Sequence, residues 1–260
     1  MKLNIVPART GIQWARLGLQ TFMKQPLALA ALVFMYSTIA VAMLVIPVVG
    51  PFIMMALVPM GTLGLMAATK VAETSSFPMP HVLLTAFRAS RERVRAMIVL
   101  GALYAVAIVV ISLIVHALVD VPDVAGKDAI ELAQMPEFVQ AMFATMLWTA
   151  VLYLPVSLAF WHAPALVHWH GIPPIKSLFF SFVACMRNAA AFTMYGLAWM
   201  GIALVIVAAS SLAGLITPWL FGVVFGAATT LASIAFYISI WFTFRDSFLD
   251  AEGNTPGDPL

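Results

Sequence analysis

Three of the five histidines fall within the stretch 161–170, at His162, His168 and His170. Imidazole nitrogens are common ligands of zinc and copper, so this cluster is the first candidate for a metal centre. On a helix, however, the three side chains point in different directions, and no nearby carboxylate or cysteine completes a set of four ligands. We therefore expect no metal and no other cofactor. The adjoining Trp161 and Trp169 favour an interfacial belt, in which tryptophans and histidines meet lipid headgroups.

His116 is a further candidate for proton chemistry, because imidazole exchanges protons near neutral pH. It lies about three residues from the outer end of an apolar run, where a histidine with only an interfacial role is the alternative. No Asp, Glu, Lys or Arg lies deep within any apolar run, although pumps, ion-coupled transporters and intramembrane hydrolases usually need such groups. The chain also has no Walker loop, GxSxG, HExxH or dinucleotide fingerprint, so we expect that it is not an enzyme.

Two prolines interrupt apolar runs at similar places, Pro59 in the second run and Pro155 in the fourth. An interrupted helix frees backbone carbonyls, and in transporters such helices often mark the substrate site. Proline is also common in ordinary membrane helices, where it only kinks a packed segment. Both interpretations stay open, and the first would suit a permease or a lipid-handling channel.

Gly222 and Gly226 in the last apolar run form a GxxxG pattern, which lets helix backbones approach closely. We expect the pattern to make a contact within the chain rather than a dimer. A homo-oligomer nevertheless stays open.

A basic stripe of Arg88, Arg91 and Arg95 precedes the third apolar run. Each such charge is worth about 1 kcal/mol near an anionic membrane surface, so the stripe could bind anionic lipid headgroups or an acidic partner. The alternative is that it serves only as a topology anchor. The formal net charge of +2 is too small to suggest nucleic acid. Membrane lipids are therefore the expected partners, and the sequence indicates no particular protein partner.

Composition identifies the elements that carry these residues. The chain is 63% hydrophobic and 9% charged, with a mean hydropathy of +1.02, whereas soluble domains are about half apolar and about a quarter charged. Its apolar residues fall in runs of about 20, the length that crosses a hydrocarbon core. The six predicted spans cover residues 27–46, 51–69, 96–119, 138–160, 191–212 and 218–242. The single Cys185 cannot form an internal disulfide and is expected to be a reduced packing residue.

The basic residues are segregated to one side of this predicted bundle. Twelve of the 13 Lys and Arg residues fall before the first span, between spans two and three, between spans four and five, or after span six. The remaining one, Lys127, lies among five acidic residues in the connection 120–137. Because cytoplasmic loops carry the excess of Lys and Arg, we expect both termini in the cytoplasm and the acidic connection outside.

Three cytoplasmic segments are predicted to be helices at the membrane surface, each preceding a span. The first covers residues 12–25, and the second would carry the basic stripe along one side. The third, residues 175–188, is apolar nearly all round and is expected to pack among the spans. The apolar face of the first gathers Ile12, Ala15, Leu19, Phe22 and Met23.

The fold class is therefore predicted to be all-α, a polytopic membrane bundle of six spans with two or three interfacial amphipathic helices. Units beginning near residues 8, 80 and 174 suggest a parallel repeat of surface helix, outward span and return span. Residues 1–250 would form a single membrane domain. Residues 251–260 are polar and turn-rich, and are predicted to be a disordered cytoplasmic tail.

A further set of residues carries a resemblance to known proteins. The set comprises the segment 11–14, Phe22, Pro26, the segment 160–167, Pro173, Ser181 and Asn188. In these residues the chain resembles an uncharacterised proteobacterial family of six-span inner-membrane proteins, similar in plan to the YciC-like group. The resemblance covers most of residues 8–245 and implies the inner membrane of a Gram-negative bacterium. It transfers no functional residue to this chain.

Three functions remain at this point. The leading hypothesis is a non-enzymatic inner-membrane protein, an accessory or scaffold in envelope homeostasis, because nothing catalytic or ion-coupling is visible. The alternative is a permease or lipid-handling channel that uses the proline-kinked spans two and four. The third is a metal-dependent membrane enzyme, which depends on the histidine cluster alone.

Overall fold

Six helices of the computed structural model are long and apolar enough to cross a membrane, and they follow one another as three hairpins. The structure describes residues 2–249, so the predicted tail 251–260 lies outside the described residues. The prediction of an all-α membrane fold with six spans is confirmed. The spanning elements are α2 (Pro26–Ala42) continued by η1 (Met43–Val45), α3 (Val49–Glu73), α4 (Arg91–Leu118), α6 (Pro136–Trp161), α9 (Ala189–Ile216) and α10 (Pro218–Ser247).

Short elements lie before or between these spans. A short helix precedes each hairpin, as predicted for the repeat: α1 (Thr10–Lys24), the 3-10 helix η2 (Pro80–Phe87) and α8 (Pro174–Arg187). The helix α7 (Ala163–His170) is an addition between α6 and α8, and α5 (Ala129–Gln134) lies in the connection from α4 to α6. Two-residue strands, β1 (Lys2–Leu3) and β2 (Phe248–Leu249), pair in antiparallel register.

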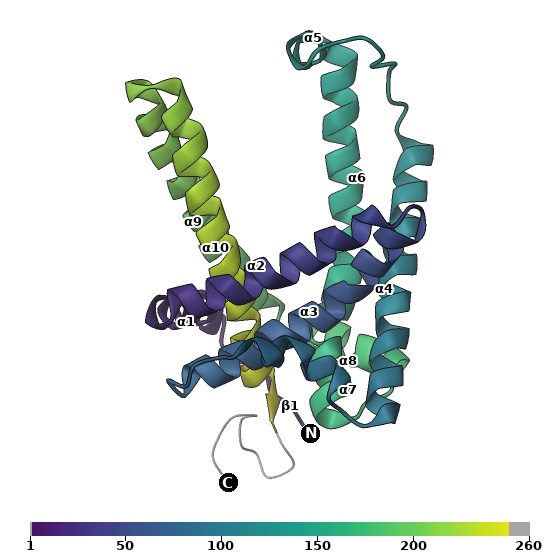
Figure 1. Cartoon of the computed structure of the whole chain (residues 1–260), viewed down its shortest axis with the longest axis vertical. Coiled ribbons are helices and arrows are strands. Elements are labelled where there is room, and N and C mark those ends of the chain that lie inside the picture. Colours follow the sequence, from purple (N-terminus) through teal and green to yellow (C-terminus); the bar gives the residue numbers. More distant parts are fainter. Residues whose placement is uncertain (1, 250–260) are drawn as a thin grey trace.

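The hairpins α4–α6 and α9–α10 rise as two separate arms from one end of the molecule, while α2 and α3 run obliquely to them (Figure 1). We call that end, which holds α1, η2, α7, α8 and the strands, the base. The bulkiest fully buried side chains are concentrated in the base and include Trp14, Trp241, Phe244 and Phe248. Along α6, by contrast, Ala141 is the single buried residue. The arms therefore present apolar side chains that the described part of the chain does not cover, as a lipid-facing surface requires.

Local sequence explains most of the helix ends. Pro26, Pro136 and Pro218 stand at the first position of their helices, where the missing N–H has no partner to lose. Among the helices that run past their predicted ends, two do so into the base: α3 continues to Glu73 and α10 to Ser247. Polar side chains on these last turns are paired with each other across the base, which lets both helices continue beyond their apolar stretches.

The structure divides the predicted apolar face of α1, since Ala15 and Phe22 are buried within the protein and the other three residues are exposed. Ile12 is 53% and Met23 71% exposed, whereas Gly11 and Gly18 lie on the buried side. A Cβ placed on Gly11 would lie 1.9 Å from the carbonyl oxygen of Ala191. Only glycine permits so close an approach, so Gly11 packs against α9 and Gly18 against α10, on the same side of α1 as the buried Trp14.

The basic stripe was predicted to lie along one helix, but the structure divides it between two elements. Arg88 is the residue after η2, and α4 begins only at Arg91. Ser90 between them is extended, with ψ of 153°, and its Oγ accepts a hydrogen bond from the Arg93 backbone N–H as an N-cap.

The helix α8 contacts the spans α6, α4 and α9, and it does so on one side only. It buries the small residues Ser177, Ser181 and Cys185, whereas Ile175 is 66% and Phe179 63% exposed. Small side chains allow close approach to α6, and the bulky ones remain on the lipid-accessible surface.

Candidate functional site

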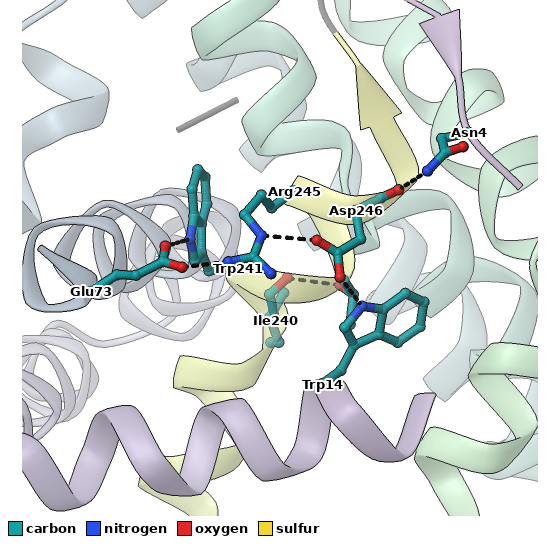
Figure 2. Close-up of polar contacts among 8 residues, drawn as sticks. Asn4, Trp14, Glu73, Ile240, Trp241, Arg245 and Asp246 are labelled. Carbon is teal, nitrogen blue, oxygen red and sulfur yellow. Dashed lines mark hydrogen bonds and ion pairs between the residues drawn. The ribbon is translucent and has the colours of Figure 1, made fainter. Parts of the chain in front are cut away.

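A chain of charged and aromatic side chains joins three helices of the base (Figure 2). Glu73 at the end of α3 forms an ion pair with Arg245 of α10 and accepts a hydrogen bond from Trp241 Nε1 at 2.9 Å. Arg245 Nε donates to Asp246 Oδ1 at 2.8 Å. The other carboxylate oxygen of Asp246 accepts from Nε1 of Trp14 on α1, also at 2.8 Å. Each carboxylate thus has both an arginine and a tryptophan as donors.

These ion pairs are shielded from solvent, with the charged side chains only 20–32% exposed. The Arg245 guanidinium also lies 4.9 Å from the centroid of the Phe242 ring. Breaking a shielded ion pair is costly, because a charge left without its partner loses both water and counter-charge. The chain of contacts therefore fixes α3, α10 and α1 to one another, and its carboxylates are occupied by structural donors.

The N-terminal segment is held in the base by Asn188, the residue that links α8 to α9. Asn188 Oδ1 accepts from the Val6 N–H at 2.9 Å, and its Nδ2 donates to the Asn4 carbonyl at 3.0 Å. Asn4 in turn donates through Nδ2 to the Asp246 carbonyl at 2.8 Å, as Figure 2 shows. One amide side chain thereby binds the residues that follow β1, beside the end of α10.

His162 lies at the break between α6 and α7 and is completely buried, so it does not belong to the predicted interfacial belt. Thr243 Oγ1 donates its single proton to the Ile240 carbonyl at 2.7 Å. His162 Nε2, 3.2 Å from that oxygen, must therefore be the donor, and Nδ1 is left as an acceptor. Cys185 Sγ lies 3.9 Å from Nδ1, a sulfur neighbour that the sequence did not reveal.

The other two histidines of the cluster face elsewhere. The His168 ring packs edge-on against Trp169, with centroids 5.9 Å apart, and His170 lies 6.0 Å from the Phe244 ring. Within residues 2–249 no three side chains of His, Cys, Asp or Glu come together in a way that could hold a metal ion. This arrangement gives the hypothesis of a metal-dependent enzyme no support.

The prolines and His116 lie apart from the base. Pro59 is buried inside α3, whereas Pro155 is exposed on α6, and both helices continue through them. His116 lines a pocket of about 310 Å³ between α4 and α6, together with Thr149 and Tyr153. The two prolines and His116 therefore do not form one site.

Of the basic stripe, Arg88 alone meets other candidate residues. It lines a pocket of about 350 Å³ with Lys70, His81 and His168. Lys70 and His81 were not among the sequence candidates, because they lie on separate elements, α3 and η2. The remaining arginines of the stripe, Arg91 and Arg95, are exposed on the first turns of α4 and do not line this pocket.

Comparison with known proteins gives one informative match. No protein-family model matches the chain, and no solved structure matches it. A probable inner membrane protein of Burkholderia thailandensis is 36% identical over 217 residues, which span 78% of this chain and 77% of that protein. The chain belongs to the same family. It is thus an inner-membrane protein with six candidate spans, as predicted from the sequence resemblance, and the likeness to the YciC-like group stays a prediction.

Proposed function

We propose that the protein is a non-enzymatic accessory or scaffold of the bacterial inner membrane, acting in envelope homeostasis. The observation that carries this proposal is the use made of polar side chains in the base. Glu73, Arg245, Asp246 and Asn188 all bind other elements of the same chain. Catalysis needs reactive groups that converge on a pocket open to substrate. Side chains already occupied by structural partners favour a structural role.

We also propose that the base, with both termini, lies in the cytoplasm. The base holds the segment before α2, the segment from η2 to the first turns of α4, and the segment between α6 and α9, which together bring most of the basic residues. The helix α5, at the far end of the α4–α6 arm, belongs to the acidic connection 120–137 (Figure 1). The excess of Lys and Arg on cytoplasmic segments supports this orientation.

Complementation of a deletion strain tests the non-enzymatic proposal. The strain is scored for envelope-stress reporter activity and phospholipid composition, then given a triple variant, His116→Gln, His170→Gln and Cys185→Ala. These groups could do chemistry but take part in neither the ion pairs of the base nor the Asn188 contacts, so we expect full complementation at wild-type abundance. An abundant, monodisperse triple variant that fails to complement would contradict the proposal. Arg245→Gln is the matched control, because it loosens the base and should lower abundance and complementation together.

A permease or lipid-handling channel is the second candidate, favoured by hydroxyl-bearing pockets on both arms. The pocket between α4 and α6 includes Thr149 and Tyr153, and one of about 320 Å³ between α9 and α10 includes Thr229 and Ser233. Hydroxyl groups inside a membrane could bind the polar part of an amphiphile. Neither pocket is lined by the two interrupting prolines, so the channel would not use the path expected from the sequence.

The prolines separate the two candidates in the same assay. Replacing Pro59 and Pro155 by Ala restores a backbone donor and a straighter helix. If the prolines only kink packed helices, the double variant should lose little stability and should still complement the deletion strain. A double variant that is inserted and abundant but does not complement would favour the channel over the scaffold.

A further inference from the structure

The pocket between α3, η2 and α7 differs from the other candidate surfaces because basic and imidazole side chains from separate elements converge in it. Lys70 comes from α3, His81 from η2, Arg88 from the residue after η2, and His168 from α7. The lining also has apolar members, among them Val71 and Trp169. A volume of about 350 Å³ is at the small end of pockets that hold organic ligands, about 300–1,000 Å³.

The positive charge of this pocket is not neutralised by the described part of the chain. The carboxylate one turn from Lys70, Glu73, is directed to Arg245 and Trp241. Within residues 2–249, neither Lys70 nor Arg88 has an acidic partner at ion-pair distance. Lys70 Nζ instead lies 5.7 Å from the centroid of the Trp241 ring, a contact that leaves its N–H donors free.

His168 adds an unused hydrogen-bonding group. Its Nδ1 is buried and has no hydrogen-bond partner among the described residues. Arg93, at the start of α4, lies near enough to act on His168 electrostatically. Because Lys70 and Arg88 supply charged donors to the lining, an anionic, hydrogen-bonding ligand fits this pocket. We propose that the pocket binds the phosphate group of an anionic phospholipid.

The surroundings of the pocket favour a lipid over a free phosphate ion. The segment that leads into η2 exposes Phe77 by 66% and Met79 by 57%, and η2 itself exposes Leu84 by 53% and Phe87 by 47%. Apolar side chains around a cationic pocket suit an interface where acyl chains lie beside a phosphate. A soluble anion would gain nothing from these side chains.

This proposal is distinct from nonspecific attraction by the basic stripe, and it does not rest on the proposed function. A discrete site depends on Lys70 and Arg88, which converge on one pocket. A diffuse attraction would depend equally on Arg91 and Arg95, which are exposed on α4 outside it. The two pairs carry the same charge, so the second pair is a matched control for the first.

Lipid binding to the purified full-length protein tests the proposal. The protein is placed in nanodiscs of phosphatidylcholine, and native mass spectrometry follows the binding of added phosphatidylglycerol. We expect the Lys70→Gln, Arg88→Gln variant to bind phosphatidylglycerol at least about tenfold more weakly than wild type, since each cation near an anionic surface contributes severalfold. The Arg91→Gln, Arg95→Gln variant should bind nearly as wild type does. Equal losses in both variants, or no loss in the first, would overturn the proposal.

Two further measurements identify the class of ligand and exclude misfolding as the cause of lost binding. The charge-conserving Lys70→Arg, Arg88→Lys variant should retain binding, so a loss there, at unchanged melting temperature, would contradict a site defined by charge. Millimolar inorganic phosphate should not displace phosphatidylglycerol from wild type. If inorganic phosphate displaced phosphatidylglycerol, the pocket would still be a phosphate site, but its assignment to a lipid would be overturned.

Discussion

At His162 and Cys185, groups that could do chemistry are enclosed by structural neighbours. The His162 ring donates to Thr243, and its backbone N–H donates to Ser181 Oγ at 2.9 Å. Cys185 is buried beside them, and burial raises the pKa of its thiol to about 12. The sequence draws attention to this histidine, but Thr243 lies 81 residues away along the chain, so its structural role was not predictable from local spacing.

Cys185 should therefore be inert to thiol reagents in the folded protein. The thiolate is the reactive form, and with a pKa raised to about 12 almost none is present at pH 7–9. We expect little maleimide labelling of the detergent-solubilised protein until it unfolds. As a positive control, Ser76→Cys in a Cys185→Ala background places a thiol on an exposed segment and should label at once. Rapid stoichiometric labelling of Cys185 at a temperature where the protein is folded would contradict this account.

At the scale of elements, the surroundings of the glycines show which helix faces are packed and which are open. Gly11 is pressed against α9, whereas a Cβ on Gly222 or Gly226 would meet nothing within 4 Å. The predicted contact of the GxxxG pattern inside the chain is therefore wrong, since that face of α10 is open. Hydropathy cannot distinguish these glycines, because lipid-facing and helix-facing positions are equally apolar in a membrane.

Substituting these glycines should affect stability unequally. Gly11→Ala forces a methyl group into the α9 backbone and should lower the free energy of unfolding by about 1–3 kcal/mol, as overpacking does. Gly222→Ala should leave it unchanged or slightly higher, because alanine favours helix. Thermal unfolding followed by tryptophan fluorescence in detergent measures both. A Gly11→Ala protein as stable as wild type would mean that α1 does not lie against α9.

The contact between α3 and α10 is expected to depend on Arg245. Its removal leaves Glu73 and Asp246 without their shared cation. Since the groups are partly solvated, we expect Arg245→Gln to lower the free energy of unfolding by about 1–3 kcal/mol, less than for a fully buried pair. Arg16→Gln, which removes an exposed charge from α1, is the control and should have almost no effect. Equal melting temperatures for the two variants would refute the role assigned to Arg245.

At the scale of the whole molecule, the sequence predicted the spans but not their arrangement. Six apolar runs are readable because each membrane helix must satisfy its own backbone and present apolar side chains to lipid. The separation of the α4–α6 arm from the α9–α10 arm has no such signal (Figure 1). The ion pair that closes the base joins residues 172 positions apart, so it also could not be read from local patterns.

The central proposal is that the base lies in the cytoplasm and carries arms that cross the inner membrane. Topology reporters test it most directly, with alkaline phosphatase and a fluorescent protein fused in turn after Lys2, Ser75, Val124 and Leu260. Because the basic segments gather at the base and the acidic connection lies beyond the α4–α6 arm, Lys2, Ser75 and Leu260 should report the cytoplasm and Val124 the exterior. A cytoplasmic signal at Val124, or an external one at Ser75, would contradict the account.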